Sequence, residues 1–102
     1  MEEAIDRFAA ALRLRPDYAV ARYNLGLALD RLSRRQEAIA AYREAIRLQA
    51  GLKEPHLNLA IALYSAGDFA GAWGEVRAFQ QLGGTPPPEF LQALSRKTPP
   101  PP

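Results

Sequence analysis

Cysteine is absent from all 102 residues of the sequence. Without it the chain has neither a disulfide framework nor a thiolate metal site, which excludes zinc fingers and fits a reducing compartment. Histidine occurs once, at His56, with no second metal ligand or nucleophile at helical spacing. We therefore expect His56 to be a packing residue, and we expect no metal ion, no cofactor and no enzymatic activity.

The sequence also lacks a strong excess of charge and any long apolar run. The 13 basic and 11 acidic side chains leave a formal charge of +2, too small for the positive field that non-specific nucleic-acid binding requires. No apolar run approaches the roughly 20 residues that span a bilayer, and the start from Met1 to Asp6 is acidic. These absences predict a soluble, cytoplasmic protein that binds neither nucleic acid nor membranes. The basic residues are 11 Arg and 2 Lys, a bias typical of GC-rich bacterial genomes.

What the sequence does contain is a repeat with a period of 34 residues. The matching pairs include Asn24 with Asn58, Leu29 with Leu63, Ala4 with Ala38 and Leu14 with Leu48. Self-similarity at a fixed period of this length is typical of stacked supersecondary units. The first residues match the second half of a unit, so we expect the chain to begin with an incomplete repeat.

Apolar residues within each unit follow helical spacing, with a polar break between two helices. The break is Ser33 to Arg35 in the first complete unit and Gly67-Asp68 in the second. This pattern predicts helical hairpins and no strands, followed by an extended proline tail from Thr98 to Pro102. Asp17 is the expected cap of the second helix. The predicted helices lie near residues 2–14, 18–32, 36–48, 54–66, 69–82 and 87–96.

These residues resemble the tetratricopeptide repeat, whose 34 residues follow the pattern W-x2-L-G-x2-Y, then A-x3-F, then a small residue and a proline. The matching residues are Leu25, Gly26, Leu29, Ala38, Tyr42 and Ala45 in one unit, and Leu59, Ala60, Leu63, Ala72 and Val76 in the next. The resemblance implies an all-α fold, a right-handed superhelical stack of antiparallel helical hairpins (an α-solenoid) with a C-terminal capping helix. The implied divisions are the second helix of an incomplete unit (1–16), two units (17–50 and 51–84), the capping helix (85–97) and the proline tail (98–102).

The sequence departs from the family pattern at three positions of the repeat. Arg22 and His56 stand where the repeat has its first aromatic residue, Ala50 and Gly84 stand where it has its closing proline, and Phe79 stands at its last small position. Phe79 therefore needs an unusual neighbour, and we expect the terminal helix to supply it through Phe90, Leu91 and Leu94. Such a helix would cap the apolar face that the last hairpin otherwise exposes.

In this family the first helix of each hairpin lines a concave groove that holds a peptide or a partner helix. The resemblance thus implies a protein or peptide partner. The implied groove residues are Tyr23, Asn24, Leu27, Arg31, Leu57, Asn58, Ile61 and Tyr64. The amides of Asn24 and Asn58 would pair with a peptide backbone, or they are simply common family residues at this position. The apolar members would anchor hydrophobic side chains, or they only contact the terminal helix and one another.

Arginines gather near the first turn between helices, at Arg31, Arg34 and Arg35. They would recognise an acidic partner through bidentate ion pairs, or they form an ordinary solvated surface. Some relatives clamp a C-terminal carboxylate with asparagines and two or more basic residues in the groove. Arg31 is the clearest basic candidate here, and the complete set is missing.

The first helix has an apolar face with no first-half partner in the sequence. Ile5, Phe8 and Leu12 form this face at helical spacing. Stacked repeats usually need about three units for stability. The missing surface would come from a longer parent protein of which this sequence is a fragment, from a partner that docks on the open end, or from a second copy of the chain. The alternative function is therefore a structural repeat protein that forms homo-oligomers through these three residues.

Overall fold

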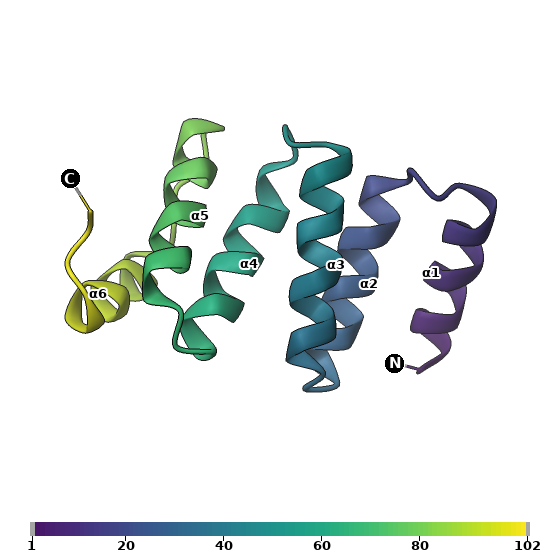
Figure 1. Cartoon of the computed structure of the whole chain (residues 1–102), viewed down its shortest axis with the longest axis horizontal. Helices are drawn as coiled ribbons and strands as arrows, with labels where there is room; N and C mark the ends of the chain where they lie inside the picture. The colour runs from purple at the N-terminus through teal and green to yellow at the C-terminus, as the bar shows by residue number, and fades with distance from the viewer. Residues whose placement is uncertain (1, 102) are drawn as a thin grey trace. The chain divides into compact units, whose positions relative to one another are not determined.

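The computed structural model describes residues 2–101, which form α-helices and no strands. The chain falls into two units, Met1–Ala50 (unit 1) and Gly51–Pro102 (unit 2). Unit 1 contains α1 (Glu2–Leu14), α2 (Ala19–Arg31) and α3 (Arg35–Leu48); unit 2 contains α4 (Lys53–Ser65), α5 (Phe69–Gln81) and α6 (Pro88–Lys97) (Figure 1). Each predicted helix end lies within one residue of the observed end.

In unit 1, α2 and α3 form an antiparallel hairpin, and α1 packs against α2. The hairpin closes on Tyr42 of α3, whose side chain is completely buried. The Tyr42 ring lies against Gly26 of α2 and 5.9 Å from the ring of Tyr23, measured between centroids. Its hydroxyl donates a hydrogen bond of 3.0 Å to Asp30 Oδ2. This bond satisfies a phenol that would otherwise be costly to bury.

In unit 2, α4 and α5 form the corresponding hairpin, with Ala60 and Val76 at the positions of Gly26 and Tyr42. Ala60 and Val76 are both completely buried. His56 is buried as expected, and its Nδ1 lies 2.7 Å from Glu75 Oε1 on α5. The buried histidine therefore links the two helices of the hairpin.

The terminal helix α6 caps unit 2, as predicted. Leu94 is completely buried, and the ring of Phe90 meets Tyr64 of α4 edge-on, with centroids 5.7 Å apart. Phe79 is also buried, and Gly84 lies against its ring so closely that a Cβ there would collide with it. The small neighbour that accommodates Phe79 is thus a glycine after α5, which the sequence pattern did not indicate.

Three helices end in the same backbone motif, with a residue of positive φ just after the helix. After α2, Ser33 N–H donates to Asp30 O and Arg34 N–H donates to Leu29 O, which is the Schellman pattern. The equivalent bonds follow α4 and α5 at Gly67 and Gly83. These motifs turn the chain sharply enough for the next segment to pack against the helix that precedes it.

The prediction of a cap at Asp17 was wrong. The capping position of α2 is Tyr18, which makes no side-chain hydrogen bond to the helix. By contrast Asp68 caps α5, with its Oδ1 accepting from Gly71 N–H at 2.9 Å. Asp17 lies one residue too early, because α2 begins at Ala19 instead of residue 18.

Candidate functional site

A pocket of about 220 Å³ lies between α1 and α2 in unit 1. Its lining residues are Ala4 and Phe8 from α1, with Asn24, Leu27, Ala28 and Arg31 from α2. The volume exceeds the ~150 Å³ of a cavity that holds a benzene ring. The pocket is therefore large enough to receive an apolar side chain of another polypeptide.

Three predicted groove residues, Asn24, Leu27 and Arg31, meet in this pocket. Helical geometry explains why these three side chains meet, because residues three, four and seven positions apart share one face of α2. Phe8, predicted as a self-association residue, lines the same pocket from α1. The predicted groove and the predicted self-association site thus share one surface, although they were predicted as separate sites.

The chemistry of the pocket is mixed. Phe8 and Leu27 are partly exposed and supply apolar surface. Asn24 offers both a donor and an acceptor. Arg31 is exposed, and its guanidinium makes no ion pair within residues 2–101. The pocket therefore combines a hydrophobic surface with one amide and one available positive charge.

Two predicted groove residues serve the packing of their own unit. Tyr23 is half-buried with its ring against Tyr42. Tyr64 packs against Phe69 at 5.6 Å and Phe90 at 5.7 Å between ring centroids. For Tyr64 the structure supports the alternative interpretation, in which the residue contacts the terminal helix.

The other predicted groove residues of unit 2 lie on α4. Leu57 and Asn58 are half-buried, whereas Ile61 keeps 38% of its surface exposed. Ile61 is the repeat equivalent of Leu27, and Asn58 is that of Asn24. The predicted role of these residues in peptide binding stays a prediction.

The self-association residues differ in their exposure. Ile5 and Phe8 are half-buried, but Leu12 retains only 8% of its surface. Leu12 therefore offers little area to a second molecule. Any association through this helix would depend mainly on Ile5 and Phe8.

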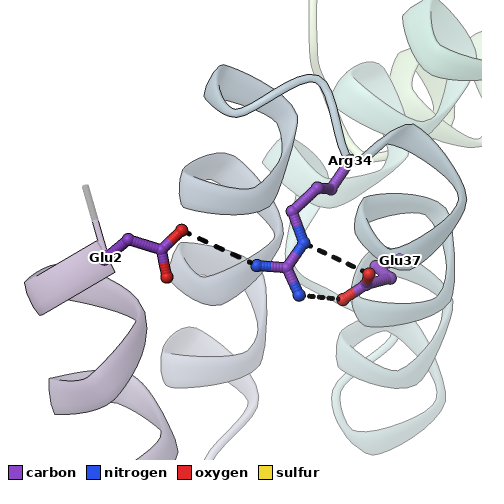
Figure 2. Close-up of polar contacts among 3 residues, drawn as sticks. All are labelled: Glu2, Arg34 and Glu37. Carbon is purple, nitrogen blue, oxygen red and sulfur yellow. Dashed lines mark hydrogen bonds and ion pairs between the residues drawn. The ribbon is translucent and has the colours of Figure 1, made fainter.

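One residue of the arginine cluster, Arg34, already pairs with carboxylates of its own unit. Figure 2 shows Arg34, just before α3, between Glu37 of α3 and Glu2 of α1. Arg34 Nη2 lies 2.7 Å from Glu37 Oε2, and Nη1 lies 3.9 Å from Glu2 Oε1. The hydrogen bond and charge of Glu37 raise the pKa of Arg34. Two carboxylates thus offset this charge, which leaves Arg31 as the cation of the pocket.

Trp73 on α5 is buried, and its indole Nε1–H donates to Thr98 O at 3.1 Å. The start of the proline tail is therefore held against α5.

Within residues 2–101, no cluster of three His, Asp or Glu side chains is arranged to hold a metal ion. Nor does any helix in that range have the length and apolar character needed to cross a membrane.

Comparison with known proteins gives two family matches. A TPR repeat model matches residues 1–33 and a tetratricopeptide repeat model matches residues 19–51. The peroxisomal targeting signal receptor of Candida albicans is 34% identical over 71 residues, or 70% of this chain. That of Saccharomyces cerevisiae is 34% identical over 73 residues, or 72% of this chain. The chain spans 12% of the length of each receptor.

Solved structures share the fold. The type III secretion translocator chaperone SycD of Yersinia enterocolitica matches 95% of this chain with a TM-score of 0.78 and 22% identity, over 66% of its own chain. A second SycD structure, in complex with a peptide of the translocator YopD, gives the same score and identity over 73% of its chain. These matches confirm the all-α, α-solenoid class. Together with the 34-residue period and the matches over residues 1–51, they lead to one conclusion: the chain belongs to the tetratricopeptide repeat family.

Proposed function

We propose that this chain is a protein-binding repeat module that holds a segment of another polypeptide at the α1–α2 pocket. The observation that carries the proposal is the meeting of Phe8, Leu27, Asn24 and Arg31 around one opening. Apolar side chains in a pocket anchor a partner, an amide pairs with peptide groups, and a guanidinium pairs with a carboxylate. This combination suits a polypeptide better than a small apolar ligand.

The similar proteins support the proposal. SycD has been solved with a peptide of the translocator YopD, and the receptors are named for a targeting signal. We extend only the general class of ligand, a polypeptide segment, to this chain. The proposal assigns no catalytic role, because the pocket is lined by alanine, phenylalanine, asparagine, leucine and arginine. None of these side chains is a nucleophile or a general acid or base at neutral pH.

A random-peptide display library selected on the full chain tests the proposal. Peptides recovered on the wild type should bind Leu27→Asp at least about tenfold more weakly, since a charge would replace an apolar anchor. Leu82→Asp is the matched control, because Leu82 is a partly exposed leucine (39%) that does not line the pocket. Equal affinity for wild type and Leu27→Asp would contradict the assignment of the site.

A second copy of the chain is the alternative occupant, favoured by the partly exposed Phe8 in the pocket wall. In that case the solution mass should rise with concentration in sedimentation runs without peptide. Phe8→Asp should restore the monomer mass. A constant monomer mass over a wide concentration range would reject this alternative.

A further inference from the structure

Consecutive prolines follow α6, at positions 99–102. Proline locks φ at about −65° and disfavours the α-helical conformation of the residue before it. Thr98 accordingly has φ −156° and ψ 139°, and α6 ends at Lys97. The chain continues beyond α6 as an extended segment (Figure 1). A run of prolines in extended backbone favours the polyproline II helix, with about three residues per turn.

The start of the proline run is fixed to the body of unit 2. The indole Nε1–H of Trp73 on α5 donates to Thr98 O at 3.1 Å, and Trp73 keeps only 7% of its surface exposed. A buried indole N–H needs an acceptor, so this hydrogen bond holds the residue directly before Pro99. The proline run therefore leaves unit 2 from a defined point.

The prolines themselves are available to a partner. Pro99, Pro100 and Pro101 are exposed, and no hydrogen bond to their carbonyl oxygens is found among residues 2–101. Pro102 lies outside these residues. Proline has no backbone N–H, so such a run cannot join a central strand. A segment that is already rigid loses little conformational entropy on binding, which favours recognition by another protein.

Positive charge lies beside the proline run. Arg96 and Lys97 in the last turn of α6 are exposed, and neither makes an ion pair within the described residues. In the sequence Arg96 stands three residues before Pro99, and Pro102 stands three residues after it. Prolines at this spacing share one edge of a polyproline II helix. A basic residue beside them suits a groove that has aromatic walls and an acidic edge.

We propose that the proline run, Pro99–Pro102, with Arg96 as its basic anchor, is a docking segment for a polyproline-binding domain of a partner protein. The partner contributes aromatic side chains that pack against Pro99 and Pro102, and acidic side chains that pair with Arg96. None of these residues lines the α1–α2 pocket. The inference therefore goes beyond the proposed function and adds a second binding segment.

Binding of the full chain to a panel of purified SH3 domains, whose grooves are of this kind, tests the inference. At least one domain should bind, and the double variant Pro99→Ala/Pro102→Ala should weaken that binding at least about tenfold. Pro100→Ala is the matched control, because it keeps both prolines of the spacing, and it should change the affinity less than about twofold. Failure of every domain to bind, or equal losses in the two variants, would overturn the inference.

Arg96→Gln tests the role of charge. This variant should bind the domain about two- to fivefold more weakly, and its affinity should depend less on salt. Arg13→Gln is the matched control, since Arg13 is likewise an exposed arginine in the last turn of a helix. Equal affinities of the two variants would overturn the role of Arg96 as an anchor.

Trp73 reports where the domain docks. It is the only tryptophan of the chain, so its indole N–H gives a single signal when the isotope-labelled protein is titrated with an unlabelled domain in nuclear magnetic resonance. Because this N–H donates to Thr98 O, docking at Pro99 should shift the signal, whereas the side-chain amide of Asn24 in the pocket should not respond. A shift at Asn24 without one at Trp73 would place the domain in the pocket and overturn the inference.

Leu27→Asp separates this inference from the proposed function. Leu27 lines the α1–α2 pocket and lies outside the proline run, so this variant should bind the domain as tightly as the wild type. Loss of peptide binding at the pocket together with unchanged binding of the domain supports two independent sites. Loss of domain binding in Leu27→Asp, with the fold intact by circular dichroism, would contradict docking at the prolines.

Discussion

Gly26 lies directly against the ring of Tyr42, so that a Cβ on Gly26 would lie 2.5 Å from Tyr42 Cε1 and 2.7 Å from Cδ1. At the equivalent positions of unit 2, Ala60 has the methyl group and Val76 replaces the ring. The two hairpins thus fill equivalent interhelical spaces in different ways. In unit 1 a glycine lies against a large ring, and in unit 2 an alanine stands opposite a smaller valine. Close packing of this kind leaves little room for added volume.

Overpacking at Gly26→Ala forces the Tyr42 ring to move, which costs about 1–3 kcal/mol. Alanine regains ~1 kcal/mol in helix propensity, so the free energy of unfolding should fall by up to about 2 kcal/mol. Urea denaturation followed by circular dichroism measures the net change in the free energy of unfolding. Gly74→Ala is the matched control, since nothing lies within 4 Å of a Cβ there, and it should stabilise the protein. A Gly26→Ala penalty that persists in a Tyr42→Val background would contradict the packing argument.

Tyr42→Phe removes the hydrogen bond to Asp30 and should cost about 1–3 kcal/mol at neutral pH. Burial, reinforced by the Asp30 carboxylate, raises the pKa of Tyr42 above its ordinary value of about 10. Above that pH the unfolded tyrosine loses its proton while the folded one keeps it, so stability falls as pH rises. The advantage of wild type over Tyr42→Phe should therefore shrink above pH ~10.

Denaturation midpoints of both proteins between pH 7 and 11 check this linkage. Tyr18→Phe serves as the control, because Tyr18 is only partly buried and no hydrogen bond to its hydroxyl is found among residues 2–101. A stability difference between wild type and Tyr42→Phe that stays constant through pH 11 would disagree with the prediction.

Ser33→Gly should stabilise the protein by about 0.5–1 kcal/mol. Ser33 has a φ of 60°, whereas the equivalent turn in unit 2 uses Gly67 at 87°. A Cβ in this left-handed region costs about 1–2 kcal/mol, and the extra freedom of glycine in the unfolded chain offsets part of the gain. Thermal unfolding should show a higher Tm for Ser33→Gly. The reverse change, Gly67→Ser, should lower it, and a shift of the same sign in both variants would argue against backbone strain.

Asp68→Ala should lower the free energy of unfolding by about 0.5–2 kcal/mol, since it leaves the N–H of Gly71 without its capping oxygen. Asp68→Asn keeps an accepting oxygen and should lose much less. Hydrogen exchange resolved by residue measures the effect directly, because the first turn of α5 should lose protection first. Unchanged exchange at Gly71 in Asp68→Ala would show that the cap contributes little.

The helices and their ends were predictable because their signals are local. Apolar spacing marked each helix, and the polar breaks around Ser33 and Gly67 fell at the observed turns. The capping role of α6 was also predictable from Phe90 and Leu94, whose apolar face needs a partner. The cap at Asp17 failed because a capping assignment changes with a shift of a single residue at the helix start.

The pocket was only half predictable. Asn24, Leu27 and Arg31 follow from family position on one helix, but the contribution of Ala4 and Phe8 was missed. The signal was present in the repeat, since Phe8 is the equivalent of Tyr42, a residue buried by the neighbouring helix. Likewise Tyr64 was assigned to the groove, although its ring packs against Phe69 and Phe90.

The sequence by itself therefore determined the helices, the turns and the repeat family, because periodicity and turn chemistry act between residues close in the chain. Only the tertiary structure decided that α1 and α2 enclose one pocket and that Phe79 rests on Gly84. It also decided that Arg34 is paired, whereas Arg31 makes no ion pair among residues 2–101. Those facts depend on how closely helices approach one another. That distance is set by the volumes and hydrogen bonds of side chains that meet only after packing.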